Sequence, residues 1–499
     1  MTTSDVGAEG HKVDQEKWRA ELYQYRELFE IAFFELHAAV LSHVNKPGQY
    51  VGAHGDYPKL SKLSSGFPAF GEFGFFDDNS PRHYVNAVKP RGLMGLLDGI
   101  KRPTANFPAA DELEAFLRTH DIGARNDWPS DYLVCDAVER YLHLYGLAAP
   151  IDRKKLNAVI LPLLWGVTAR EGLPLRLVAP IALTNIEVDH FQLNDSAYIT
   201  RIPRRLQLAR ARMRTTGTGA EGMVVGAATH AFVSTGWSID VEKVSEVYTS
   251  LNQVAENAID AIDSFFGALR IVTGVETGYA QLLWVPRGWA QSYFCDLTPV
   301  FGKALRRYPN EFDNYGWSYQ APSVSGRDLI EVRRIYRATV ENESEAVWLA
   351  LKRLNGCLTR SDAADAILDG TIGLELLLGD DQSQSLAYKL RMRAGALASL
   401  QHNGGHTPSQ VASKVKKLYE ARSAIVHGRR KKGSKQASEP SDYRHAEDRK
   451  TASELLRFIL DVLLTHPQYL QPSKIDDELL LGRASSHGRP RRDRQSGEA

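Results

Sequence analysis

The C-terminal third of the chain contains a regular succession of helical patterns, and this feature restricts its fold more than any other. Beyond Pro322, apolar residues recur at three- and four-residue steps in segments separated by short polar breaks. Six helices are predicted, over residues 328–339, 344–359, 362–378, 385–402, 409–427 and 446–465. Thr407 and Pro408 supply an N-cap and a preset first turn. Short connections favour antiparallel neighbours, so residues 323–482 are predicted to form an all-helical bundle.

The rest of the chain predicts an α+β protein. Residues 12–41, 109–120 and 129–147 read as helices, and residues 47–103 form a glycine- and aromatic-rich loop. Its rings could stack on bases, although a loop pinned by its aromatics is the favoured reading. Between 155 and 237 the period falls toward two, which predicts strands, including 186–193 and 222–235; 278–295 is another strand. Residues 241–272 predict a long helix.

Length and composition set the domain count. A chain of 499 residues exceeds what one hydrophobic core usually supports. We therefore expect a helical N-terminal region (1–150), a mixed α/β middle domain (151–322), the helical bundle (323–482) and a disordered tail (483–499). The 61 Lys and Arg residues almost balance 60 Asp and Glu, which argues against a uniformly basic surface but not against local basic patches.

Cofactor and membrane signals are weak. Cys135, Cys295 and Cys357 form no CxxC pair, so buried thiols in a reducing compartment are expected rather than a disulfide scaffold or a zinc knuckle. The glycines at 217–222 match GxGxxG, yet the flanking residues favour a hairpin loop over a dinucleotide site. Residues 1–20 lack a secretion signal, and the apolar run 156–167 is too short for a bilayer. A cytoplasmic protein with no membrane partner is expected.

The residues that point to chemistry lie near the end of the fifth predicted helix. Arg422 is followed five positions later by His427, and Gly428 is the usual residue type just beyond a helix. A histidine that titrates near neutrality suits proton transfer. Arg422 falls within the apolar stripe of its helix and therefore needs an anionic partner. Glu375, which interrupts the apolar run 372–378, is one candidate, and a phosphate is another.

By itself an arginine and a histidine at this spacing are weak evidence. The pair also fits a core arginine in a salt bridge and a surface histidine that caps its own helix. The order of the surrounding segments is more specific. They run Ala350-Leu-Lys-Arg-Leu-Asn355, Ile372-Gly-Leu-Glu-Leu-Leu-Leu-Gly379, Leu386-Ala-Tyr-Lys-Leu-Arg391 with Arg393 beyond, and Leu418-Tyr-Glu-Ala-Arg-Ser-Ala-Ile-Val-His-Gly428.

In this order, residues 348–465 resemble the HEPN domain in its Apea-like branch. The resemblance implies a helical bundle that commonly dimerises and, in many members, a metal-independent endoribonuclease with no cofactor, often in a toxin or an anti-phage defence system. The family motif maps onto Arg422 and His427. Ser423 occupies the position after the motif arginine, where the family often has Asn, Asp or His. The first 320 residues would then sense a phage or antitoxin trigger, or restrain the nuclease.

The implied reaction is physically reasonable, because RNA carries its own nucleophile in the 2′-hydroxyl. His427 would transfer the proton, Arg422 would hold the scissile phosphate, and Glu375 would orient Arg422. Basic residues that follow the motif could contact RNA: Arg429, Arg430, Lys431 and Lys432. A second arginine-rich stretch, 201–214, could bind phosphates or protect an exposed strand edge. Two alternatives stay open: a non-catalytic module that binds RNA or a partner, and a purely structural bundle.

Overall fold

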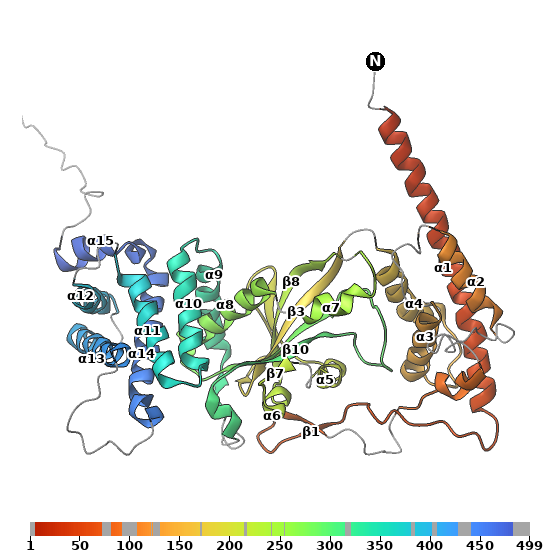
Figure 1. The fold of residues 1–499 in the computed structure, drawn as a ribbon, viewed down its shortest axis with the longest axis horizontal. Helices are drawn as coiled ribbons and strands as arrows, with labels where there is room; N and C mark the ends of the chain where they lie inside the picture. The colour runs from red at the N-terminus through yellow and green to blue at the C-terminus, as the bar shows by residue number, and fades with distance from the viewer. Residues whose placement is uncertain are drawn as a thin grey trace, which may run out of the picture.

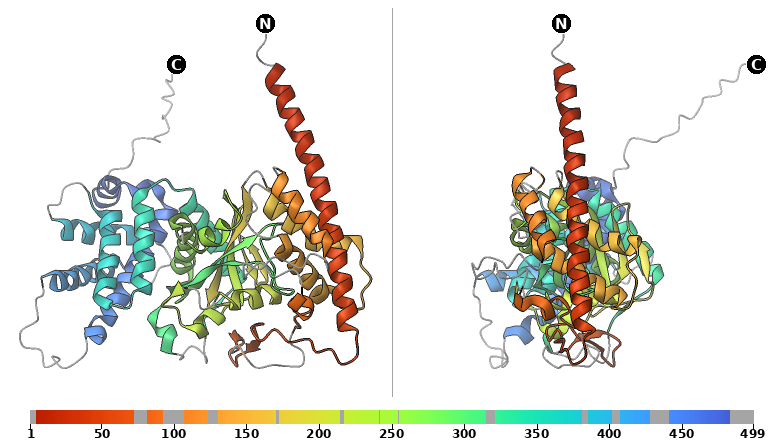
Figure 2. Two further views of the ribbon diagram at one scale, coloured as in Figure 1. Left: turned by 45° about the vertical axis from the view of Figure 1, so that its right-hand side comes forward. Right: turned by 90° about the vertical axis from the view of Figure 1, so that its right-hand side faces the viewer.

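The protein is elongated and combines helices with one larger sheet. The computed structural model describes residues 5–71, 81–91, 107–120, 122, 130–169, 172–213, 217–240, 242–253, 255–314, 321–380, 385–401, 407–427 and 441–482. Helices from the N-terminal part occupy one end, the sheet lies in the middle, and the C-terminal helices occupy the other end (Figure 1). The left-hand view in Figure 2 shows the same order. The predicted tail lies outside the described residues.

The central sheet has seven strands in the order β5-β6-β8-β3-β9-β10-β7. Its strands are β3 (Leu173–Ala182), β5 (His190–Gln192), β6 (Ala197–Arg201), β7 (Gly217–Thr218), β8 (His230–Ile239), β9 (Gly278–Pro286) and β10 (Phe301–Arg307). β3 pairs antiparallel with both β8 and β9, whereas β7 joins β10 in parallel. Because β3 is buried along nearly its whole length, it reads as an apolar run rather than as an alternation. Two short pairs lie outside this sheet: β1 (Leu60–Lys62) with β2 (Pro68–Phe70), and β4 (Asn185–Ile186) with β11 (Ser323–Val324).

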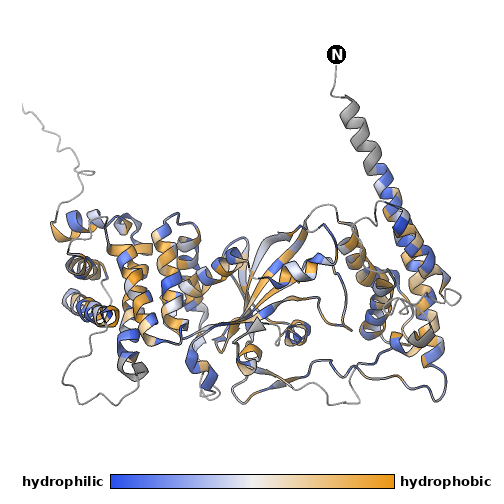
Figure 3. Cartoon of the chain, viewed as in Figure 1, coloured by the Kyte–Doolittle hydropathy of each residue, from blue (hydrophilic) through white to orange (hydrophobic). Residues whose placement is uncertain are grey.

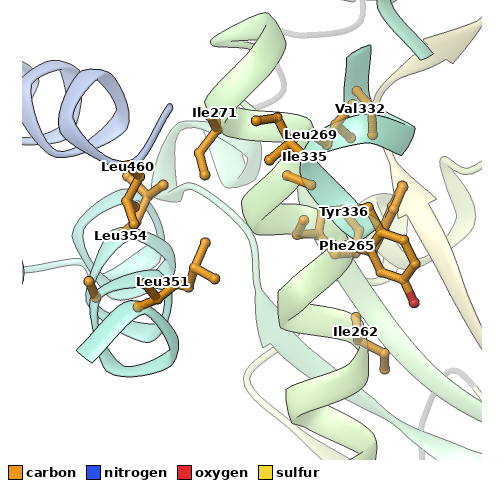
Figure 4. Packing of buried hydrophobic residues seen from close by; sticks show 14 of the residues in the cluster. Ile262, Phe265, Leu269, Ile271, Val332, Ile335, Tyr336, Leu351, Leu354 and Leu460 are labelled. Carbon is orange, nitrogen blue, oxygen red and sulfur yellow. The ribbon is translucent and has the colours of Figure 1, made fainter. Parts of the chain in front are cut away.

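One hydrophobic cluster continues from the sheet into the C-terminal helices. Helix α8 (Glu256–Thr273) carries Phe265 and Leu269, which lie beside Tyr336 and Ile335 of α9 (Gly326–Val340) (Figure 4). Leu351 of α10 (Glu345–Thr359) belongs to the same cluster and lies on the other side of α8. The approach of α8 to α10 is close, because a Cβ at Gly267 would lie 2.7 Å from Leu351 Cδ2. The sheet and the C-terminal helices therefore share a core.

From Gly326 onward the described residues form helices joined by short connections, with no strand among them, as the sequence pattern predicts. After α9 and α10 come α11 (Ala363–Leu378), α12 (Leu386–Ala398), α13 (Pro408–Val426) and α14 (Ser441–Thr465), followed by short turns of η6 (Pro467–Leu470), α15 (Pro472–Lys474) and η7 (Ile475–Leu480). Figure 3 shows hydrophobic residues along α10, α11 and the central strands. α10 packs on α11, α11 on α14, and α12 on α13. Small residues allow this: a Cβ at Gly373 would lie 2.6 Å from Leu456 Cδ2.

The N-terminal end has its own core. α1 (Asp5–Val44), α2 (Pro108–Thr119) and α3 (Ser130–Tyr145) contribute to one cluster, and η1 (Val85–Arg91) packs beside them. In the predicted aromatic loop, Phe67 is fully buried and Phe70 lies 4.8 Å from the Arg210 guanidinium, so these rings are held by the protein itself. Phe73, Phe75 and Phe76 lie outside the described residues. None of the described helices combines the length and the apolar character needed to cross a bilayer.

Several predictions for the middle of the chain are wrong. The segment at 153–168 is a helix, α4 (Arg153–Thr168), and not the start of a strand pattern. Its buried residues recur at three- and four-residue steps and pack with the N-terminal cluster: Leu156, Val159, Ile160, Leu163, Leu164 and Val167. The predicted helix at 241–272 is two helices, α7 (Glu246–Asn252) and α8, since the apolar pattern continues across a break in the backbone.

The glycine- and arginine-rich part also differs from the prediction. Residues 217–222 are not a hairpin loop, because Gly217 and Thr218 form β7, and α6 (Gly222–Gly226) precedes β8 where a single strand was expected. The arginine stretch contains a helix, α5 (Arg204–Ala211), and not a strand edge. Arg210 is fully buried and donates to the backbone carbonyls of Val225 and Gly226. A side chain satisfied in this way is unavailable to phosphate.

Candidate functional site

Helices α11 and α13 bring the predicted arginine and carboxylate together. Arg422 Nε lies 3.4 Å from Glu375 Oε1, and the two side chains are 30% and 20% exposed, respectively. The predicted apolar stripe of α13 holds at Val415 and Leu418, which are buried, but Val426 is exposed at the helix end. Arg422 therefore lies at the border between the core and the solvent, and not inside the core.

The pair is incompletely satisfied. In the described part of the chain, neither Arg422 Nε nor Glu375 Oε1 has a hydrogen-bond partner of adequate geometry, although both atoms are buried. The guanidinium carbon lies 5.3 Å from the centre of the Tyr419 ring, within cation–π range. Burial and the nearby Glu375 carboxylate raise the pKa of Tyr419 above its usual value. One carboxylate and one ring leave donors of the guanidinium available to an anion.

His427 is the C-cap of α13, and its backbone N–H donates to the Ser423 carbonyl over 3.1 Å. Its side chain is exposed, while Ser423 is partly buried. On a regular helix His427 is rotated about 140° from Arg422. Among the described residues no contact joins the imidazole to Arg422 or Glu375. The structure thus brings Arg422 and Glu375 together but leaves His427 apart within one chain.

The predicted RNA-contacting residues Arg429, Arg430, Lys431 and Lys432 lie outside the described residues. Of the second arginine stretch, Arg201 pairs with Asp189 at 2.6 Å and Arg205 with Asp296 at 3.2 Å. Arg212 stacks 3.5 Å from the centre of the Phe294 ring. The Arg201 and Arg205 side chains are more than half exposed, so these two ion pairs lie at the surface, whereas Arg210 is engaged inside the fold.

Arg393 belongs to the segments that carry the family resemblance, and its contacts are those of an arginine that stabilises the fold. Its guanidinium is almost fully buried and donates to Asp476, Asp380 and the Leu378 carbonyl, with distances of 2.6–2.8 Å for the shortest contact to each. Lys389 and Arg393 together lower the pKa of Asp380 to about 2. These ion pairs connect α12 to the end of α11 and to the C-terminal turn.

A polar cleft that the sequence did not indicate lies between α8, β10, α10 and α11, with a volume of about 480 Å³. Both signs of charge line it, including Asp260, Arg306, Arg307, Lys352, Arg353 and Asp369. Arg353 donates to the buried Asp369 over 2.7 Å, and Arg360 donates to its other oxygen. Since opposite charges there neutralise one another, the cleft provides no clear preference for anions or cations. Neither Arg422 nor His427 borders it.

Comparisons of the chain with protein-family models, with curated proteins and with solved structures give no match. The likeness to HEPN domains therefore rests on the sequence segments alone. Side chains able to hold a metal ion come together elsewhere, around His54 between the N-terminal helices and the sheet. The sequence missed this cluster because its members are far apart along the chain.

Proposed function

We propose that the C-terminal helices act as a HEPN-type, metal-independent endoribonuclease in a toxin or anti-phage defence effector. The observation that carries this proposal is the half-exposed Arg422, which has one carboxylate neighbour and lies on the helix that ends at the exposed His427. An arginine with unused donors at the protein surface is suited to a phosphate. The N-terminal and middle domains would sense a trigger or restrain the nuclease.

In this mechanism Arg422 binds the scissile phosphate and offsets the negative charge that develops in the transition state. His427 takes the proton from the ribose 2′-hydroxyl or donates a proton to the leaving 5′-oxygen. Glu375 holds the guanidinium in place, and Tyr419 packs against it. Ser423 lies between Arg422 and His427 in the sequence. Its backbone carbonyl accepts the His427 N–H and so helps to hold the C-terminal end of α13.

The separation of Arg422 from His427 within one chain favours a dimeric site. Two copies of α13 that face each other across a twofold axis would bring the arginine of one chain toward the histidine of its partner. Such a site also contains two imidazoles, which can serve as the general base and the general acid. Homodimerisation is thus part of the proposal.

The test uses purified full-length protein and total RNA in buffer with excess EDTA. Wild type is expected to cut RNA and to leave 2′,3′-cyclic phosphate ends, because the 2′-hydroxyl is the nucleophile. Arg422→Ala and His427→Ala should each lower the rate by about 10²–10³-fold, the range for one transition-state donor or one acid–base group. Lys416→Ala is the matched control, since Lys416 is an exposed cation on the same helix.

Equal cleavage by wild type and His427→Ala at matched purity would remove the catalytic proposal. One observation favours a second function, a non-catalytic module that binds RNA or a partner. Among the residues that the structure describes, Arg422 pairs with Glu375 and the His427 side chain contacts neither of them. For that function, labelled RNA would be bound and remain intact at high protein concentration, and Arg422→Ala would weaken binding whereas His427→Ala would not.

A further inference from the structure

Five side chains that can ligate metals converge where the N-terminal helices meet the sheet. His54 follows α1, His83 precedes η1, Glu139 and His143 lie one turn apart on α3, and Cys295 lies between β9 and β10. One ligand atom from each of His54, His143 and Cys295 lies within 4.8 Å of the others, and the same holds for His54, His83 and Glu139. These residues come from four separate segments of the chain.

Backbone contacts fix the two loops that carry His54 and His83. The backbone N–H of His54 donates to the Pro81 carbonyl and that of His83 to the Gly52 carbonyl, each over 2.7 Å. These bonds flank an antiparallel bridge between Ala53 and Arg82. The two imidazole rings are consequently held with their centres 3.3 Å apart.

The loop that carries Cys295 is attached to α3. Arg140 donates to the Leu297 carbonyl over 2.8 Å, and Asp136 accepts from the backbone N–H of Tyr293 over 2.7 Å. Cys295 itself has a φ of 51°, a left-handed conformation that is uncommon for any residue other than glycine. Strained backbone of this kind is concentrated at functional sites.

The hydrogen bonds of the two histidines leave one nitrogen of each free. His54 Nε2 donates to Glu139 Oε1 over 3.1 Å, so Nδ1 of the neutral ring carries the lone pair. Asp56 Oδ1, at 3.7 Å, is too far from this Nδ1 for a hydrogen bond. His143 Nδ1 donates to the Glu139 carbonyl over 2.7 Å, which leaves the lone pair on Nε2.

Both remaining nitrogens are buried and lack a hydrogen-bond partner among the described residues. Burial lowers the pKa of the His143 imidazole below its usual value, against the opposing effects of the Glu139 carboxylate and of the Glu139 and Arg82 carbonyls. His54 is 8% exposed, the His143 side chain 6% and Cys295 2%. A buried acceptor without a partner costs about 1–3 kcal/mol, and a cation bound among His54, His143 and Cys295 would satisfy these two nitrogens.

We propose that His54, His143 and Cys295 bind a zinc ion that fastens the N-terminal helices to the sheet domain. Two imidazole nitrogens and one thiolate are the ligand types that Zn²⁺ prefers. Glu139 then acts from outside the ligand set, because a carboxylate that accepts from the second nitrogen of a ligating histidine fixes the ring orientation. This role fits its other contacts, as its oxygens also accept the backbone N–H groups of Tyr84 and Val85.

The second group, His54, His83 and Glu139, is less suitable for binding the zinc ion. Asn86 donates from its amide to His83 Nδ1 over 3.1 Å, and both oxygens of Glu139 are already engaged. A cysteine nucleophile paired with histidine is the other chemistry that these residue types suggest. Cys295 is only 2% exposed, however, so a substrate cannot reach its sulfur as a nucleophilic reaction requires.

The experiment measures metal binding by the full-length protein. Protein freed of metal by a chelator is titrated with Zn²⁺, and separately with Co²⁺, and the bound metal is measured after gel filtration. One equivalent per chain is expected, and the Co²⁺ form should show the near-ultraviolet thiolate-to-metal charge-transfer band. Cys295→Ser should lose this band, and His54→Ala should bind Zn²⁺ at least 10-fold more weakly, on the scale of a lost ligand.

Cys135→Ser is the control, because Cys135 is another buried thiol on α3 but does not belong to the cluster. It should keep both the stoichiometry and the charge-transfer band. No retained metal in the wild type, or a band that persists in Cys295→Ser, would overturn the proposal. If Cys295→Ser fails to fold, the wild-type melting temperature decides: added Zn²⁺ should raise it in the metal-free protein, and an unchanged value would count against the site.

Discussion

Three arginines in this protein differ in how completely their charges are satisfied. Arg210 and Arg393 are buried and donate to several carbonyls and carboxylates, so the fold uses their donors. Arg422 has one carboxylate neighbour at 3.4 Å and a partly exposed side chain. An arginine keeps its charge at any physiological pH, so unused donors at a surface favour an anionic ligand. At the scale of the residue, this difference distinguishes Arg422 from its structural counterparts.

The buried His230 is expected to make the stability of the protein depend on pH. Burial and, to a smaller extent, the charge of Arg201 lower the pKa of His230 from 6.5 to about 4, against the opposing effect of Asp189. The unfolded chain then binds a proton that the folded chain rejects. The contribution of His230 to the free energy of unfolding is fully present above pH 6.5. It decreases as the pH falls toward about 4, by up to about 1.4 kcal/mol per pH unit.

The measurement is urea unfolding across that pH range for wild type and His230→Asn. The variant cannot titrate, so its stability should fall less than that of the wild type as the pH decreases. Parallel curves for the two proteins would show that His230 is not responsible for the pH dependence. The Thr229 hydroxyl, 2.9 Å from His230 Nδ1, can also bond an asparagine amide, which makes this replacement conservative.

At the scale of the element, α13 is the helix on which the proposed site depends. It begins with a capping box, because the Gln410 backbone N–H donates to the Thr407 hydroxyl over 3.3 Å and the Thr407 N–H donates to Gln410 Oε1 over 2.9 Å. These bonds satisfy donors that the first turn would otherwise leave unpaired. The other end is less constrained, since His427 caps it through backbone contacts alone.

We therefore expect Thr407→Ala to lower the free energy of unfolding by about 1 kcal/mol, the usual cost of losing an N-cap side chain. Ser413→Ala is the matched control, because Ser413 is exposed within the same helix and alanine is the better helix former. In urea unfolding, Thr407→Ala should have a lower free energy of unfolding than wild type, and Ser413→Ala should have an equal or a higher one. Equal stability of Thr407→Ala and wild type would show that the capping box contributes little.

At the scale of the whole molecule, the continuous core from the sheet to α14 has a consequence for regulation. α8 packs directly on α10 and shares one hydrophobic cluster with α14 and with α11, which carries Glu375. Under the proposed function, a movement of the sheet would therefore be passed to Glu375. The proposed zinc site joins the sheet to the N-terminal helices at the other end. A signal received by the N-terminal region could reach the proposed site along this path.

The dimeric arrangement of the proposed nuclease can be tested by mixing. Wild type is co-expressed in equal amounts with His427→Ala, and the cleavage rate per total protein is compared with that of wild type alone. If one site needs both motifs across a twofold axis, about a quarter of the dimers keep two intact motifs, and the rate should fall to about that fraction. A rate near one half would mean that each site needs only one imidazole, whether it acts with the arginine of its own chain or with that of the partner.

The sequence by itself predicted the C-terminal helices, the N-cap at Thr407 and Glu375 as a neighbour of Arg422. The helices and the cap succeed because helix periodicity and capping depend on residues only a few positions apart. The pairing of Glu375 with Arg422 follows from a different rule, since a charge within an apolar stripe requires an opposite charge nearby. The helix at 153–168 was missed although its apolar residues recur at helical steps, because the period was misassigned. The break between α7 and α8 and the burial of Arg210 were decided by tertiary packing. The cluster around His54 is the extreme case, because loops and helices distant in sequence must fold together before its ligands meet.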